Sequence, residues 1–242
     1  MKILGIETSG KICGLALSEN ERILVEYNLN LGLKHSELLL PLIEQALNTV
    51  HWQTESLDGI AVDKGPGSFT GIRIGLSAAR TLAQLLNIPL VGIVSLDALA
   101  ENIPPSHFLL LPLADALGGM VYTTLYQYKK GKWQRLLPYQ LTNIDTLLNL
   151  YKTREKPILF IGEGALIYRK KIKNRFKQFA YFAEDNFFPQ AASIARLGRE
   201  KMRKKKGKNF SQVLPFYLRR SYAEERWSPH PPLRWTSDEE CR

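Results

Sequence analysis

The sequence predicts an α/β fold built as two similar lobes, each a mixed sheet with helices. Apolar runs of strand length alternate with segments whose apolar residues recur at helical spacing, which is typical of this class. A pattern of strands followed by helices occurs twice, before and after Pro104-Pro105. These observations place a first lobe at residues 1–103 and a smaller second lobe at 104–189. A last helix at about 190–206 is expected to return to the first lobe, ahead of an extended tail at 207–242.

The elements of the first lobe begin with three short apolar runs at residues 2–8, 12–18 and 22–28. Polar turns separate them, so they predict an antiparallel meander. An amphipathic helix follows at 38–50, with Ser36 as its cap and Pro41 at its start or at a kink. The lobe then continues with a strand at 58–63, a helix at 71–86, a strand near 90–94 and a short helix at 97–101.

The second lobe repeats this alternation. The predicted elements are strands at 109–113, 120–128 and 132–138, a helix near 143–151, a strand at 158–161 and a basic helix near 165–175.

Composition narrows the function classes. Lys and Arg number 33 against 23 Asp and Glu, a formal charge of +10 that favours polyanionic partners such as RNA. No run approaches the roughly 20 apolar residues that span a bilayer, and Glu7 comes too early for a signal peptide. The two cysteines, Cys13 and Cys241, are expected as free thiols. A cytoplasmic protein without a membrane partner is predicted.

A glycine-rich loop joins the strand at 58–63 to the helix at 71–86. No Lys-Ser or Lys-Thr pair follows its last glycine, so it is no Walker A loop, and its spacing misses the dinucleotide-binding pattern by one residue. Two interpretations stay open: a turn that packs a helix onto a strand, or an anion site at a helix N-terminus. The loop residues are Gly65, Pro66, Gly67, Ser68, Phe69, Thr70 and Gly71.

This loop and the segment after it, KGPGSFTGIRIGLSAARTLA, resemble the hallmark segment of the TsaB family. Members of that family are partners of the TsaD enzymes that make threonylcarbamoyladenosine in tRNA. Residues 3–9, ILGIETS, are similar to the opening strand of both families. Three further segments resemble TsaB in order along the chain: residues 35–43, residues 115–122 (with Leu117 where an Arg is common) and residues 215–220.

The resemblance implies a two-lobe actin-like (ASKHA, RNase H-like) fold and a non-catalytic scaffold. Such a subunit binds and activates TsaD, whose complex transfers a threonylcarbamoyl group to N6 of adenosine at tRNA position 37. TsaD would carry a divalent metal and threonylcarbamoyl-AMP, TsaE would carry ATP, and this chain would carry no cofactor. The alternatives are an actin-like phosphotransferase or ATPase acting alone, or a tRNA-binding protein. A protease is unsupported, because no catalytic dyad or metal pair stands out.

The resemblance places the TsaD contact on the helix at 38–50 and the helix after the glycine loop, and a homodimer can use the same surface. Leucines cover more than half of the first helix, which suggests a second apolar face. Arg73 lies in a first helical turn, where a cation is unfavourable, so either a specific contact or a solvated side chain explains it. The interface residues expected are His35, Leu38, Leu39, Leu42, Ile43, Ala46, Leu47, Arg73, Leu76 and Arg80.

Similarity to TsaD would give Glu7 and Thr8, beside Ser9, roles at a metal and nucleotide. Gly10 and Lys11 stand where TsaD-like enzymes carry further acids, so these residues are interpreted as a vestigial nucleotide site. Asp115 belongs to the same site, either as a remaining ligand or only as a turn-forming residue.

No metal is expected in this chain. His35 has only leucines three and four residues later, so no helical ligand pair forms and a capping or surface role is the default.

Two basic segments offer phosphate contacts to tRNA, or else are solvated helix faces. Their candidate residues are Arg169, Lys170, Lys171, Arg203, Lys204, Lys205 and Lys206.

Overall fold

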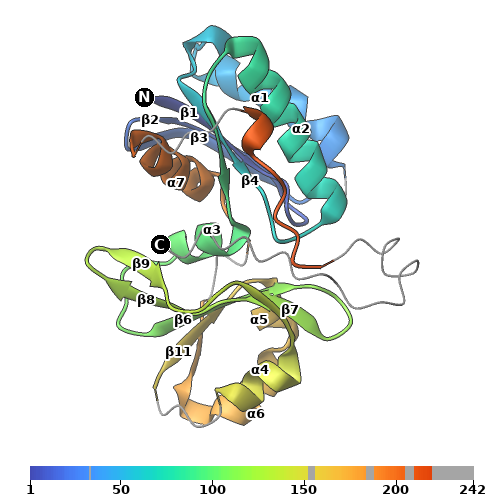
Figure 1. Cartoon of the computed structure of the whole chain (residues 1–242), viewed down its shortest axis with the longest axis vertical. Coiled ribbons are helices and arrows are strands. Elements are labelled where there is room, and N and C mark those ends of the chain that lie inside the picture. Colours follow the sequence, from blue (N-terminus) through green and yellow to red (C-terminus); the bar gives the residue numbers. More distant parts are fainter. Residues whose placement is uncertain (33, 152–155, 184–187, 205–209, 220–242) are drawn as a thin grey trace.

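The computed structural model describes residues 1–32, 34–151, 156–183, 188–204 and 210–219, which form two lobes, one above the other in Figure 1. The first lobe contains a five-stranded sheet of order β3-β2-β1-β4-β5. Its strands β1, β2 and β3 form the predicted antiparallel meander, and β1, β4 and β5 run parallel. The strands are β1 (Lys2–Glu7), β2 (Cys13–Glu19), β3 (Arg22–Leu29), β4 (Gly59–Asp63) and β5 (Leu90–Ile93).

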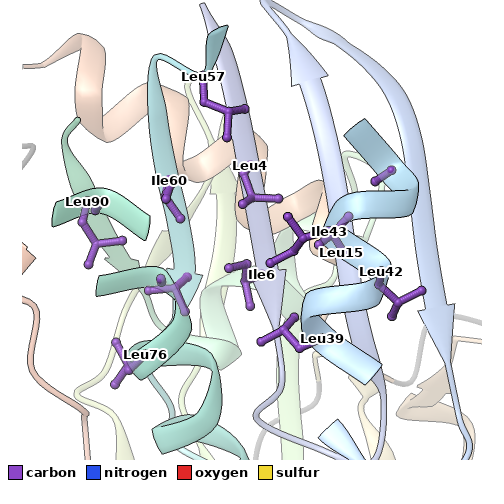
Figure 2. Packing of buried hydrophobic residues seen from close by; sticks show 14 of the residues in the cluster. Leu4, Ile6, Leu15, Leu39, Leu42, Ile43, Leu57, Ile60, Leu76 and Leu90 are labelled. Atoms are coloured by element: carbon purple, nitrogen blue, oxygen red, sulfur yellow. The ribbon is translucent and has the colours of Figure 1, made fainter. Parts of the chain in front are cut away.

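Helices α1 (His35–Thr49) and α2 (Phe69–Leu86) pack on one face of this sheet. Figure 2 shows Leu39 and Ile43 of α1 beside Leu4, Ile6 and Leu15 of the sheet. All five side chains are buried, and burial of apolar surface is the main stabilising contribution to this lobe.

Helix α7 (Ala191–Arg203) packs on the other face, against β1, β2 and β4, although most of the chain separates it from them. Gly198 allows this close approach, because a Cβ there would lie 2.2 Å from the Cβ of Ala61. The first lobe is therefore a sheet between two helical layers.

The second lobe holds a seven-stranded sheet along the path β10-β7-β6-β11-β12, with β8 paired to β6 and β9 to β8. Helices α4, α5 and α6 belong to this lobe, and α3 contacts both β6 and α7. The strands are β6 (Leu109–Asp115), β7 (Met120–Thr123), β8 (Tyr126–Lys129), β9 (Lys132–Arg135), β10 (Gln140–Asn143), β11 (Ile158–Ile161) and β12 (Ala180–Phe182). The helices are α3 (Ser95–Glu101), α4 (Ile144–Leu150), α5 (Glu163–Ile167) and α6 (Arg169–Phe176), with short 3-10 turns η1 (Thr54–Ser56), η2 (Lys177–Phe179) and η3 (Phe210–Gln212).

Several predicted boundaries were wrong for local reasons. Helix α1 begins at His35, so Pro41 lies inside the helix and not at its start. Ser36 is also inside the helix and is not its cap. Pro41 cannot donate a backbone hydrogen bond to the carbonyl of Glu37, but both residues are exposed, so water can satisfy that carbonyl. The strand predicted at 120–128 is two strands, β7 and β8.

The basic helix is also two helices, α5 and α6, which meet at Tyr168. Strands β10 and β12 were not predicted, because one is polar and the other has three residues.

Cys13 is a free thiol inside β2, where burial raises its pKa. Cys241 and the rest of the tail from residue 220 lie outside the described residues. None of the described helices is long and apolar enough to cross a lipid bilayer.

Candidate partner groove and interlobe cleft

A pair of buried carboxyl groups closes the parallel strands β1 and β4. The backbone N–H and Oγ of Ser9 donate to Oε1 of Glu7 at 2.7 and 2.6 Å. The N–H of Gly65 and Oγ of Ser95 donate to Oδ1 of Asp63 at 2.6 and 2.7 Å. Burial, and then the neighbouring Asp63 carboxyl, raise the pKa of Glu7 well above its ordinary value, and burial raises the pKa of Asp63. Both shifts favour the neutral form of the carboxyl group, most of all at Glu7.

These contacts do not fit a metal and nucleotide site of the actin-like kind. Glu7 and Ser9 bond to each other, and the Thr8 hydroxyl donates to the carbonyl of Gly71 at 2.8 Å. Asp115 accepts a long hydrogen bond of 3.5 Å from the hydroxyl of Tyr168. Within the described part of the chain, no group of three or more His, Cys, Asp or Glu side chains could hold a metal ion.

The glycine loop packs directly on the end of β1. A Cβ at Gly67 would lie 2.2 Å from the carbonyl oxygen of Ser9, and one at Gly71 would lie 2.0 Å from that of Thr8. Ser68 caps α2, because its Oγ accepts from the N–H of Gly71 at 3.2 Å. The geometry thus supports the packing interpretation of the loop at these two glycines.

His35 is buried, which corrects the expected surface or capping role. Its side chain is 2% exposed, and Nε2 lies 2.9 Å from the carbonyl oxygen of Gly10. A carbonyl only accepts, so Nε2 carries the hydrogen in this contact. His35 thereby ties the start of α1 to the loop after β1.

A cavity of about 620 Å³ lies between the lobes. Ser9 and Asp115 line it, whereas Glu7 and Thr8 do not. Across the cleft, the Lys11 ammonium donates to the Glu163 carboxylate, and this hydrogen bond raises the pKa of Lys11. The four residues of the vestigial site are therefore only partly brought together.

Residues 213–219 form an extended segment, here called the strap, that joins the two lobes. The N–H of Phe216 donates to the carbonyl of Lys64 at 2.7 Å, on the first lobe. Arg219 Nη1 donates to the carbonyl of Ala116 at 2.6 Å, on the second lobe. The strap therefore ties the glycine loop to the loop after β6.

The arginines of α2 hold the strap, which sequence reasoning missed. Arg73 Nε donates to the hydroxyl of Tyr217 at 3.1 Å, and its guanidinium lies 3.8 Å from the ring centre of Phe69. Phe69 and Tyr217 stack with ring centres 4.8 Å apart. Arg80 donates to the carbonyl of Val213. Helix α2 begins at Phe69, so Arg73 lies in its second turn rather than in the first turn predicted, and its specific contact is within the chain.

Most of the expected interface residues are interior side chains, which corrects that part of the prediction. A side chain buried in its own lobe offers little surface to another protein. The interior ones, at 7% exposed or less, are His35, Leu39, Leu42, Ile43, Ala46, Leu47 and Leu76, whereas Leu38 is half-buried.

A groove of about 670 Å³ nevertheless lies between α1 and α2. Leu40, which is 59% exposed, stands on its α1 side. Phe69 lines both the groove and the interlobe cavity, so the two share a wall. The residues lining the groove are Ser36, Leu39, Leu40, Phe69, Thr70, Arg73, Ile74, Ser77, Ala78, Thr81 and Leu82.

The basic candidates separate between the lobes. Arg169, Lys170 and Lys171 are exposed on α6 in the second lobe. Arg203 and Lys204 lie at the end of α7, which packs on the first sheet. Lys205 and Lys206 lie outside the described residues.

The fold and the site together define an actin-like two-lobe protein. Polar residues at its interlobe cleft form hydrogen bonds within the chain, such as Ser9 to Glu7 and Lys11 to Glu163. The ROK hexokinase of Thermus thermophilus shares this fold, at a TM-score of 0.52 and 14% identity over 84% of this chain and all of that one. YeaZ of Pseudomonas aeruginosa superposes with a TM-score of 0.76 and 24% identity, covering 90% of this chain and 100% of that one.

Sequence comparison then gives the family. The family model for TsaD, tRNA N6-adenosine threonylcarbamoyltransferase, matches residues 31–227. The tRNA threonylcarbamoyladenosine biosynthesis protein TsaB of Bacillus subtilis is 35% identical over 232 residues, 94% of this chain and 98% of that protein. The chain belongs to the TsaB family.

Proposed function

We propose that this chain is a non-catalytic scaffold subunit in the biosynthesis of threonylcarbamoyladenosine in tRNA. It binds and activates a TsaD enzyme through the groove between α1 and α2. The name of the Bacillus subtilis relative supports the pathway. The observation that carries the proposal is the groove itself, which is lined by residues of α1 and α2 alone.

The groove suits the side of a helix. Ile74, Ala78 and Leu82 recur along α2 at helical spacing and are only partly buried. Ser77 and Thr81 are small, so a partner helix can approach closely. An exposed apolar surface of this kind marks a protein interaction site.

The family model supports TsaD as the occupant. It matches residues 31–227, which include both α1 and α2. A partner built on the same plan carries a corresponding pair of helices, and like surfaces can pack about an approximate two-fold axis. A second copy of this chain satisfies the same condition, so a homodimer is the competing occupant.

The cleft supports a non-catalytic role. The Glu7 carboxyl is buried and faces Asp63, so it is not available to a metal or a phosphate. In the proposed complex TsaD holds the divalent metal and threonylcarbamoyl-AMP, and TsaE holds ATP. The transfer to N6 of adenosine 37 would then occur on TsaD.

Size-exclusion chromatography with light scattering tests the groove. The pair Leu40→Glu/Ser77→Glu changes two groove residues that face solvent. The wild-type chain should elute with TsaD as a heterodimer, and the variant should elute apart from it while keeping its melting temperature. Leu85→Glu is the control, because Leu85 lies on α2 like Ser77 and is 75% exposed but does not line the groove.

Equal loss in both variants, or a wild-type chain that never binds TsaD, would overturn the proposed interface. A wild-type chain that forms only its own dimer through the groove would favour the homodimer.

A further inference from the structure

Helix α6 and the turn after it carry a dense positive charge that the proposed function does not use. Of the cations in this segment, only Lys171 has a carboxylate partner among the described residues, the two oxygens of Asp145 at 3.0 and 2.9 Å. Six cations fall within nine residues, and all are exposed: Arg169, Lys170, Lys171, Lys173, Arg175 and Lys177.

The position of three of these cations is electrostatically unfavourable. Arg169, Lys170 and Lys171 occupy the first turn of α6, and that turn holds no acidic residue. Backbone N–H groups give a helix N-terminus a partial positive charge, which repels cations there. A bound polyanion would remove this repulsion.

Aromatic rings gather where β12, the last strand of its sheet, meets the segment just before β6. Tyr181 is 43% exposed, and its ring stacks on Phe108 with centres 4.5 Å apart. The exposed ring of His107 lies edge-on to Phe108 at 4.4 Å. We call these three residues the aromatic stack.

Strand alternation places the cations and the aromatic stack on the two sides of this edge. Phe182, the neighbour of Tyr181, points to the opposite face of the sheet. There the Arg169 guanidinium lies 4.8 Å from its ring centre and the Lys173 ammonium 6.0 Å. The basic helix and the aromatic stack therefore flank one short strand.

We propose that this edge binds a single-stranded stretch of RNA, with phosphates on the α6 cations and bases on the aromatic stack. Duplex RNA would supply phosphates but no free base faces, whereas unpaired nucleotides supply both. The inference rests on the proposed function for its choice of RNA, since a tRNA carries unpaired loops, and it assigns an RNA contact to this chain itself.

The proposed RNA site, here called the RNA edge, consists of α6, β12 and the aromatic stack. It lies on a different lobe from the groove between α1 and α2, so one site can be tested without the other. Helices α1 and α2 cover the first sheet, and α6 and β12 belong to the second (Figure 1). Binding of TsaD is therefore expected to survive every variant of the RNA edge.

Fluorescence anisotropy with the full chain tests the proposal. The probes are a labelled tRNA transcript, a labelled 12-nucleotide single-stranded RNA and a blunt RNA duplex. The single strand should bind more tightly than the duplex. Lys170→Ala/Arg175→Ala should weaken single-strand binding at least tenfold at low salt. It should also flatten the slope of log K against log salt by about 1.4, since each lost phosphate contact to a single strand accounts for about 0.7.

Tyr181 separates stacking from net charge. Tyr181→Ala should weaken single-strand binding at least fivefold with an unchanged salt slope, and Tyr181→Phe should restore it. Lys129→Ala/Lys132→Ala is the matched control for charge, because it removes two exposed lysines from the β8–β9 hairpin of the same lobe.

The proposal is overturned by any of three results: no RNA binding by the wild-type chain, duplex binding as tight as single-strand binding, or equal loss in the hairpin control. Co-elution with TsaD is measured for each variant. If co-elution persists while RNA binding is absent, the RNA edge alone is refuted and the scaffold function stands. If co-elution fails while RNA binds as described, the scaffold proposal fails instead.

Discussion

The buried carboxyl groups of Glu7 and Asp63 lie close together inside the first lobe, at the ends of two adjacent parallel strands. Each carboxyl accepts two hydrogen bonds through one oxygen, from Ser9 to Glu7 and from Gly65 and Ser95 to Asp63. The pair thus joins β1, the glycine loop and the start of α3. Glu7, which the sequence offers as a vestigial ligand, thus makes its hydrogen bonds within the chain.

This pair should make stability depend on pH. The folded-state pKa of Glu7 is raised by burial and then by Asp63, so the native state binds more protons than the unfolded state above the ordinary Glu value of about 4.5. The pair's contribution to stability is full below that value and is lost as pH rises through the folded-state pKa. Glu7→Gln keeps an oxygen that can accept both hydrogen bonds from Ser9, and it stays neutral beside Asp63 at every pH.

We therefore expect Glu7→Gln to raise the melting temperature near pH 8 and to flatten its pH dependence. Thermal unfolding between pH 5 and 9 checks this, with exposed Glu37→Gln as control. A variant that loses stability equally at every pH would contradict the raised pKa of Glu7 in the folded protein.

The glycine loop shows how far the sequence could lead. Its position between a strand and a helix, and the meander before it, follow from periodicity. Periodicity does not decide between anion binding and close packing of the loop. That choice depends on the contacts of Gly71 with Thr8 and of Gly67 with Ser9, which are distant in the sequence. The same holds for Arg73, whose partner Tyr217 is 144 residues away in the chain.

Apolar periodicity likewise found both helices of the groove but could not separate their two faces. Leucines that serve the lobe's own core and leucines that face solvent occur at neighbouring positions in α1. Only the packed structure distinguishes Leu39, at 1% exposed, from Leu40, at 59%.

The packing interpretation of the loop predicts a sharp contrast between two glycines. Gly71→Ala places a methyl group 2.0 Å from the Thr8 carbonyl oxygen, so the backbone must move, and we expect a loss of about 3 kcal/mol or more. Gly10→Ala is the control, because nothing lies within 4 Å of a Cβ there. Urea denaturation of both variants measures the difference, and similar stabilities would refute the close contact.

The cluster of Phe69, Arg73 and Tyr217 should behave as one unit. Tyr217→Phe removes only the hydrogen bond from Arg73, at a cost of about 1 kcal/mol. Tyr217→Ala also removes the stack on Phe69, which adds roughly another 1 kcal/mol. In a double-mutant cycle, Arg73→Ala and Tyr217→Phe should be non-additive, since both break the same bond. Additive free energies of unfolding would mean that the strap is held by other contacts.

The last prediction separates core from interface along α1. Leu39→Ala should cost about 2–5 kcal/mol of stability, because the side chain is buried against the sheet (Figure 2). Leu40→Ala, one residue further on, should change stability by less than about 0.5 kcal/mol and weaken TsaD binding instead. Urea unfolding and titration calorimetry with TsaD measure the two effects. If Leu40→Ala left TsaD affinity unchanged, this side chain would be no part of the contact; if Leu39→Ala left stability unchanged, its place in the core would be wrong.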